Sequence, residues 1–345
     1  MKKPIAVFTA AVMILLICGC SGSQDKTEYK SDVFAMDTFM TVKAYGEKGK
    51  SAVKEAEAEI KRLEALFSVT DGGSEVSLLN RSGGKAVGVS QETAELISRS
   101  IEISDKTDGA LDITVYPLVR EWGFTTGDYK IPDKTTVDGL LENTGYKNIN
   151  ISGKTVTLKD NTEIDLGAVA KGYTADRIIE IMKKNGVTSA LVNLGGNVQA
   201  LGKKPDGSLW KIGIEDPFGG DDNVCTLDIE NRAVVTSGNY QRYFTGEDGR
   251  RYCHIIDPSN GYPADNELVS VTVIGDSGFQ CDSLATALFV MGKEKAINFC
   301  RNNRDIDAVL IDKDGNICIT EEIYSAAEIN GGTAPTVIKR ERNEK

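Results

Sequence analysis

The order in which strand-like and helix-like segments follow one another constrains the fold of this chain most. An early strand pair over residues 33–42 is followed by apolar residues at helical spacing over 51–66 and by a second helix over 91–106. The second half is rich in strands and returns to a helix only over about 279–301. Because strands and helices do not alternate regularly, a doubly wound parallel sheet is disfavoured. We expect an α+β fold with mixed sheets and flanking helices.

Shorter apolar runs give the remaining expected elements. A helix over 168–184 is predicted to stop at Asn185-Gly186, a common helix C-terminal signal. The expected strands run over 112–116, 147–151, 155–158, 190–194, 209–214, 225–230, 233–236, 252–256, 268–274, 307–311 and 316–319.

The net charge excludes one large class of function. The 345 residues are 40% hydrophobic, which is enough to bury a large core, and their formal net charge is −11. Binding to a nucleic acid backbone needs clustered Lys and Arg, and no such cluster is found in the sequence. We therefore expect no nucleic-acid partner.

The N-terminal segment is an export signal. Lys2 and Lys3 precede an apolar run over 5–17, which is shorter than the roughly 20 residues of a membrane-spanning helix. The run ends at Gly19-Cys20 and resembles a bacterial lipobox, so cleavage before Cys20 would leave a lipidated cysteine. The alternative is a plain signal peptide. The expected organisation is a lipoprotein signal peptide at 1–19, a tether at 20–31, one folded region or two intimate subdomains at 32–332, and a charged tail at 333–345, held at the extracytoplasmic face of the cell membrane.

The other cysteines do not form a metal or redox motif. No CxxC pair is present, which argues against a zinc site. Their odd number argues against a dense disulfide framework and leaves room for one or two bridges, and most are expected to be small buried residues. They are Cys225, Cys253, Cys281, Cys300 and Cys318.

Glycine-punctuated turns offer places where a phosphate could bind, although neither GxxxxGK[ST] nor GxGxxG is present after a strand. Asp165 stands before a helix that carries Lys171 in its first turns, and the start of a helix favours anions. The alternative, a capping aspartate with a solvated lysine, has equal weight on the residues alone. Gly195-Gly196 and residues 236–240 also follow strands, but ordinary turns explain them at least as well.

Two further segments carry reactive side chains. His254 is the single histidine of the chain, and a lone histidine on a strand is more often structural than catalytic. Asp282 and Thr286 lie one helical turn apart on a face that also holds Ala285 and Phe289, so a buried carboxylate there needs a partner. A carboxylate and a hydroxyl are hard ligands that suit Mg²⁺. Equally, Asp282 could simply cap the helix.

In combination, six motifs resemble the ApbE-like family of FAD:protein FMN transferases. The resemblance runs from about Met36 to Thr320. The motifs are Asp108 to Val119 with Trp122-Gly123-Phe124, Ile164 to Gly172, Gly195-Gly196-Asn197, Thr236 to Tyr240, His254 to Pro258, and Asp282 to Ala287.

The resemblance implies a reaction and a set of site residues. Family members use Mg²⁺ and FAD to transfer FMN to a threonine hydroxyl of an acceptor protein, releasing AMP. The acceptor would be a membrane redox pump subunit or an extracytoplasmic electron-transfer protein. By position, Asp282, Thr286 and the carbonyl of Ala168 would bind Mg²⁺, and either His254 or Asp282 would serve as the base. The FAD site would be lined by Met36, Ala110, Leu111, Asp112, Asp165, Lys171 and Ile256.

Two departures from the family pattern leave other activities open. Some members have a second aspartate where this chain has Ala285, and many have a flavin-stacking aromatic residue near Thr70. The enzyme alternative is a Mg²⁺-dependent FAD pyrophosphatase that forms FMN and AMP. The alternative outside enzymes is a flavin-binding lipoprotein. A solute-binding lipoprotein fits the lipobox but not the motifs.

Overall fold

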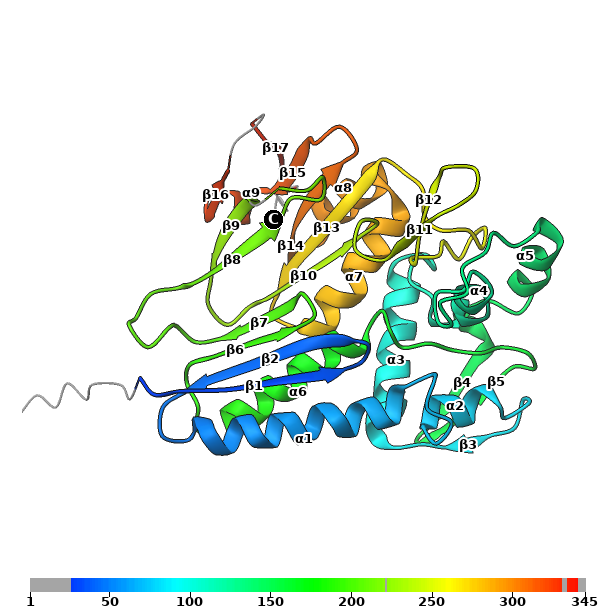
Figure 1. Ribbon diagram of the computed structural model, residues 1–345, viewed down its shortest axis with the longest axis horizontal. Coiled ribbons are helices and arrows are strands. Elements are labelled where there is room, and N and C mark those ends of the chain that lie inside the picture. Colours follow the sequence, from blue (N-terminus) through cyan, green and yellow to red (C-terminus); the bar gives the residue numbers. More distant parts are fainter. Residues whose placement is uncertain (1–25, 221, 331–333, 341–345) are drawn as a thin grey trace, which may run out of the picture.

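A sheet of nine strands runs through the middle of the computed structural model, which describes residues 26–220, 222–330 and 334–340 (Figure 1). Neighbouring strands are antiparallel except for the last two, which are parallel. The mixed sheet and its flanking helices confirm the predicted α+β class. In sheet order the strands are β1 (Glu28–Ala35), β2 (Thr38–Tyr45), β6 (Ala190–Leu194), β7 (Asn197–Leu201), β10 (Ala233–Gly238), β13 (Leu268–Gly275), β14 (Ile306–Asp312), β15 (Ile317–Thr320) and β17 (Thr336–Ile338).

Helices cover one face of this sheet. The apolar stripe predicted from the spacing of α1 residues, including Ala56, Ile60 and Leu63, is buried against β1, β2 and α6. Helix α7 is buried on nearly every side, which explains why its sequence is apolar all round. The helices are α1 (Gly49–Phe67), α6 (Ala170–Lys184), α7 (Gly278–Met291) and α8 (Lys293–Asn302).

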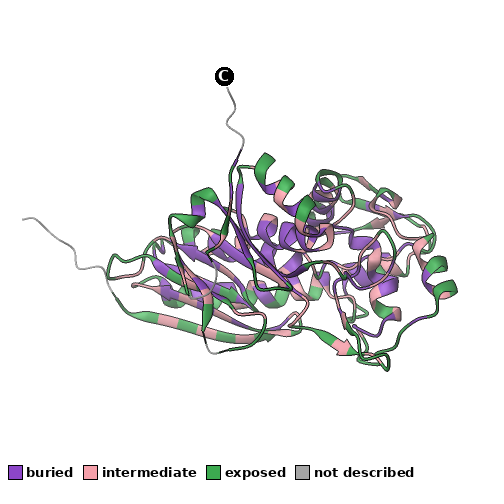
Figure 2. Cartoon of the chain, turned by 90° about the horizontal axis from the view of Figure 1, so that it is seen from above, coloured by how far each residue is buried: buried purple, intermediate pink, exposed green. Residues whose placement is uncertain are grey.

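The opposite face is covered mainly by a second sheet, with Ile323 of a short helix in the same cluster. Its strands pair in the order β16 (Ala327–Ile329), β9 (Asn223–Ile229) and β8 (Trp210–Glu215). Trp210 and Leu227 pack there against Val234 and Val309 of the central sheet. All residues of β13 and β14 are therefore buried, because both faces of these strands are covered. Figure 2 shows that the buried segments lie in the interior of the molecule.

A third group of elements lies beside the ends of α1 and α7 (Figure 1). Leu96 and Val156 from this group share one core cluster with Val271 and Leu288, so the packing is continuous with the central sheet. The group contains α2 (Glu75–Asn80), β3 (Val87–Gly88), α3 (Gln91–Lys106), the 3₁₀ helix Ile113–Val115, α4 (Tyr116–Glu121), α5 (Lys134–Leu141), the 3₁₀ helix Tyr146–Asn148, β4 (Ile149–Ser152) and β5 (Thr155–Leu158). Two shorter strands, β11 (Tyr243–Thr245) and β12 (Arg251–Cys253), and helix α9 (Glu321–Tyr324) complete the fold.

Three predicted elements need correction. The expected strand at 112–116 is a 3₁₀ turn leading into α4, because Asp112 caps it and Pro117 occupies the helix start, where its missing N–H does no harm. The expected helix at 279–301 is two helices, divided by Gly292 with φ +78°. The expected strand at 252–256 ends at Cys253, and Ile256 makes only an isolated bridge to Pro263.

Two predicted boundaries are also wrong. The tether expected at 20–31 is too long, because β1 already begins at Glu28 and pairs with Tyr45. The tail expected at 333–345 contains β17 and Arg340, whose buried guanidinium forms a 2.9 Å ion pair with Asp307. The predicted signal peptide and Cys20 lie outside the described residues.

The remaining sequence-level questions concern thiols and membrane spans. The five cysteines from Cys225 onward are all free and buried, so the bridges left open by the sequence do not form among them. Their predicted role as small buried residues is confirmed. No helix within the part of the chain that the structure describes is long and apolar enough to cross a bilayer.

Candidate functional site

A cavity of about 260 Å³ lies where the β1–β2 hairpin tip, the start of α6 and the side of α7 converge. Segments far apart in the sequence meet there, including residues 110–113, 236–242 and 254–256. Every catalytic, flavin-binding and metal-binding residue predicted from the sequence lines this one cavity, whereas the predicted lipidation site Cys20 lies outside the described residues. These residues are Met36, Ala110, Leu111, Asp112, Asp165, Ala168, Lys171, His254, Ile256, Asp282 and Thr286. Their placement brings them together; their individual roles remain predictions.

Two glycines fix the distance between α6 and α7. A Cβ on Gly172 would lie 2.2 Å from the Gly278 carbonyl oxygen and 2.6 Å from the Asp282 Cβ. Because neither glycine has a side chain, the helix backbones touch, and the Gly172 N–H donates to Asp282 Oδ2 at 2.8 Å. The close crossing thus places the Asp282 carboxylate against the first turn of α6.

Asp176, which the sequence analysis did not identify, holds the same crossing at the start of α7. Its carboxylate accepts hydrogen bonds from Gly278 N at 2.6 Å, Phe279 N at 3.0 Å and Ser277 Oγ at 2.7 Å. These groups include backbone donors that a helix N-terminus leaves unpaired. Since the bonds span about a hundred residues of sequence, no local pattern could have revealed them.

Asp282 is a buried carboxylate without an ion pair among the described residues. Its exposed fraction is 4%, and burial raises its pKa, although Lys171 and the Gly172 N–H act in the opposite direction. The N-cap of α7 is Ser277, so the alternative reading of Asp282 as a helix cap is wrong. A buried carboxylate with no cation partner is expensive unless a ligand supplies one.

The groups around Asp282 fit a hard metal ion. The Thr286 hydroxyl makes only long contacts, 3.4 Å to the Asp282 carbonyl oxygen and 3.2 Å to Ser237 Oγ. Together with Ala168 in the cavity wall, these residues supply carboxylate, hydroxyl and carbonyl oxygens, which Mg²⁺ prefers. Among the described residues, no three His, Cys, Asp or Glu side chains gather as they would around zinc.

The start of α6 supplies a cation to the cavity. The only hydrogen bond that Lys171 Nζ makes within the described residues is a 3.3 Å bond to the Gly167 carbonyl oxygen, and the side chain is half-buried. Asp165 accepts from Gly167 N at 2.9 Å in a local turn, while Val169 occupies the N-cap position of α6. Burial raises the pKa of Asp165, opposed by Gly167 and Lys171. Asp165 therefore does not cap α6, whereas the role of Lys171 stays a prediction.

Asp112 contributes mainly by shaping the wall. Its carboxylate accepts from Thr114 N at 2.8 Å, Thr114 Oγ1 at 2.6 Å and Tyr146 N at 2.8 Å. Burial raises its pKa, partly offset by the bonds from Thr114. These bonds hold the Asp112 carboxylate in the cavity wall, next to Ala110 and Leu111.

The surroundings of His254 favour the neutral form of its ring. Its Nδ1 lies 3.2 Å from the Arg242 carbonyl oxygen, which can only accept, so Nδ1 carries the proton and Nε2 is free to take one. Burial and the positive charge of Arg242 lower its pKa to about 4.

A second cavity of about 390 Å³ continues the first. The two share Met36, Thr125, Asp165, Gly167 and Arg242 in their walls. Thr70 lies in the second cavity, and the aromatic rings there are Phe34 and Phe67. Arg242 was missed by the sequence analysis, although a cation two residues beyond the 236–240 segment was a usable signal.

Comparisons with known proteins agree with this geometry. The model of the ApbE family matches residues 36–310. An FAD:protein FMN transferase of Klebsiella pneumoniae is 37% identical over 266 residues, covering 76% of this chain and 82% of that protein. One of Treponema pallidum is 30% identical over 342 residues, covering 92% and 94%.

Solved structures are similar in fold as well as sequence. The crystal structure of the ApbE protein from Thermotoga maritima superposes with a TM-score of 0.82 at 34% identity, covering 87% of this chain and 99% of that one. The flavin transferase ApbE from Vibrio cholerae gives a TM-score of 0.79 at 28% identity, with the same coverage.

Proposed function

The chain belongs to the ApbE family, and on that basis we propose that it transfers FMN from FAD to an acceptor protein. The observation that carries the site assignment is Asp282, a buried carboxylate that has no ion-pair partner in the described part of the chain and stands beside Lys171 at a helix start. That combination suits a metal ion next to a phosphate.

We propose that the metal is Mg²⁺ and that the acceptor group is a threonine hydroxyl. Asp282, Thr286 and the Ala168 carbonyl would hold the ion, which neutralises charge on the pyrophosphate when bound. Lys171 would contact the same pyrophosphate with its ammonium group. The hydroxyl oxygen forms a bond to the phosphorus of the FMN half, the bridging P–O bond breaks, and AMP leaves with the bridging oxygen.

We assign the proton of that hydroxyl to His254 and not to Asp282. The Asp282 carboxylate would already be engaged with the metal, whereas Nε2 of neutral His254 is free. A pKa of about 4 makes a weak base, but a bound pyrophosphate would stabilise the imidazolium and raise this value.

Location is a further part of the proposal. The lipobox-like sequence predicts lipidation at Cys20, which would anchor the protein at the extracytoplasmic face and give it acceptors there: electron-transfer proteins or subunits of membrane redox pumps. Replacing Cys20 with Ala should release the protein from membranes or leave it unprocessed. Unchanged mass and membrane retention would contradict the lipid anchor.

The reaction is tested by incubating the purified protein with FAD and Mg²⁺, with and without a candidate acceptor. We expect AMP release that depends on the acceptor, and flavin that stays on an acceptor threonine after denaturation. AMP without acceptor would indicate an FAD pyrophosphatase. Flavin binding without AMP or modified acceptor would indicate a binding protein and overturn the proposal.

A further inference from the structure

Arg242 occupies the seam between the two cavities. Its side chain is 44% exposed and lines both of them, whereas Lys171 lines only the first. Its charge also reaches both neighbours, since after burial it lowers the pKa of His254 and it opposes the rise that burial causes in the pKa of Asp165. Arg242 is therefore a second cation of the site, and it lies where the two cavities join.

The charges of the first cavity leave a need for such a cation. Its wall carries three carboxylates, on Asp112, Asp165 and Asp282, against the single ammonium of Lys171 and the two positive charges that the proposed Mg²⁺ would bring. A pyrophosphate adds two negative charges. Repulsion between these groups would oppose binding unless further positive charge is present.

Among the described residues, the guanidinium of Arg242 has two partners. It donates a hydrogen bond to the Phe124 carbonyl oxygen, and its ion pair with Asp37 is long, at 3.5 Å, with the Asp37 side chain 75% exposed. By contrast, Arg120 is held by both Glu163 oxygens. The planar fork of an arginine matches a phosphate with two parallel hydrogen bonds.

Asp37 is held over the cavity by the hairpin tip. Asp37 and Met36 adopt φ of +60° and +48°, values that are unusual for residues other than glycine, and Met36 N donates to Glu64 Oε1 at 2.6 Å. The fixed turn presents the carboxylate to Arg242 without enclosing the pair. Such an exposed pair is readily replaced by a stronger anion.

We infer that Arg242 binds the pyrophosphate of FAD, with Asp37 as its counterion in the free protein. The inference rests on the proposed use of FAD. The residue couples two tasks, because its side chain would hold the phosphate while its carbonyl oxygen accepts from both the backbone N–H and Nδ1 of His254.

The test compares Arg242→Ala with Arg250→Ala, a matched control on an exposed arginine that lines neither cavity. FAD binding is measured by flavin fluorescence in EDTA, so that no turnover occurs, at several NaCl concentrations. We expect Arg242→Ala to raise the Kd for FAD roughly 10- to 100-fold and to reduce its salt dependence. The Kd of Arg242→Lys for FAD should lie between those of the parent and of Arg242→Ala. Asp37→Asn should bind FAD slightly more tightly than the parent does.

The outcomes separate this inference from the proposed function. An unchanged Kd in Arg242→Ala, or a raised Kd with the full salt dependence of the parent, would overturn the role of Arg242. Riboflavin, which lacks phosphate, serves as a competitor: an equal loss of riboflavin and FAD binding would indicate general damage and also overturn it. If the parent binds FAD but never releases AMP, the proposed function fails while the effect on Kd still decides the role of Arg242.

Discussion

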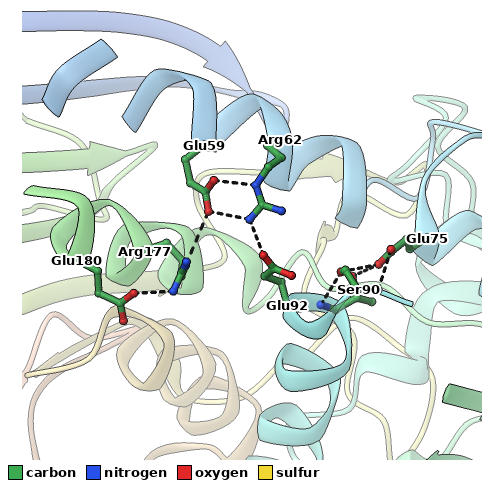
Figure 3. A network of polar contacts seen from close by, with 8 residues as sticks. Glu59, Arg62, Glu75, Ser90, Glu92, Arg177 and Glu180 are labelled. Carbon is green, nitrogen blue, oxygen red and sulfur yellow. Dashed lines mark hydrogen bonds and ion pairs between the residues drawn. The ribbon is translucent and has the colours of Figure 1, made fainter. Parts of the chain in front are cut away.

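Two charged regions of this protein are built in opposite ways. Between α1, α3 and α6, acidic and basic side chains pair in a chain of contacts (Figure 3). Arg62 contacts Glu59 and Glu92 at 2.8 Å each, and Arg177 contacts Glu180 at 2.6 Å. Hydrogen bonding to Arg62 lowers the pKa of Glu59. In the cavity, by contrast, burial raises the pKa of Asp165 and Asp282.

The difference distinguishes charged groups that stabilise the fold by pairing with each other from charged groups that are suited to binding a ligand. The α1–α3–α6 network pairs its charges internally, so little is gained there by binding an ion, and each exposed pair adds only a few tenths of a kcal/mol. The cavity carboxylates lack a guanidinium partner at ion-pair distance in the described residues and destabilise the fold, which is typical of sites that bind cations.

The largest effect is expected from Asp282→Asn. The amide keeps the hydrogen bond from Gly172 N but is a poor ligand for Mg²⁺, so FMN transfer should fall at least 10²-fold and lose its Mg²⁺ response. Thermal unfolding should show equal or higher stability, because a buried charge is removed. Full activity with an unchanged Mg²⁺ requirement would place the metal elsewhere.

His254→Ala should come next, with a loss of roughly 10²–10⁴-fold in turnover and an intact Mg²⁺ response. A loss of only a few-fold would show that the ring merely packs against Phe124.

The pH dependence of the same residue has a defined sign. With a folded pKa of about 4, His254 stays neutral at pH 5 to 7, so kcat/KM limited by this group should fall only as pH approaches 4. For stability, the unfolded chain binds a proton near pH 6.5 and the folded one does not. The contribution of neutral His254 to the free energy of unfolding is therefore complete above pH 6.5 and is lost as pH falls toward 4. Unfolding of parent and His254→Gln across this range measures it; parallel curves would contradict the lowered pKa.

Lys171→Ala should weaken FAD binding by about 1.5–3 kcal/mol, since one charge-assisted contact to phosphate is removed. Fluorescence titration measures the change. If Lys171→Ala bound and turned over FAD as the parent does, Lys171 would have no role in binding FAD.

The smallest effect is expected in the α1–α3–α6 network. Glu59→Gln weakens the contacts with Arg62 and the 3.8 Å pair with Arg177, which should lower the free energy of unfolding by about 0.5–1 kcal/mol. FAD binding and the Mg²⁺ response should not change. A change in FAD binding or in the Mg²⁺ response would mean that the network and the cavity are coupled, and it would contradict their separate roles.

The resemblance of six motifs to a known family predicted which residues meet in the cavity, whereas local patterns alone left structural alternatives open at Asp165, His254 and Asp282. The motif residues converge on one cavity because the packing of segments far apart in the sequence brings them together. The region 112–116 was misread because Ile113 and Val115 favour strands, whereas the decisive interactions are the Asp112 cap and its long-range bond from Tyr146 N. The roles of Asp176 and β17 depend on partners far along the chain, which no local window contains.

The contact between Gly172 and Gly278 also bears on how such a protein can change over evolutionary time. The two positions are separated by 106 residues (278 − 172), yet a methyl group at either would collide with the backbone of the other, at 2.2 Å in one direction and 2.6 Å in the reverse. Neither position can acquire a side chain in a single neutral step, and a substitution would move Asp282 away from Ala168 and Lys171 even though all three remained in the sequence. A relative that keeps those residues but has lost either glycine would be a candidate for a degenerate descendant that still folds and no longer catalyses.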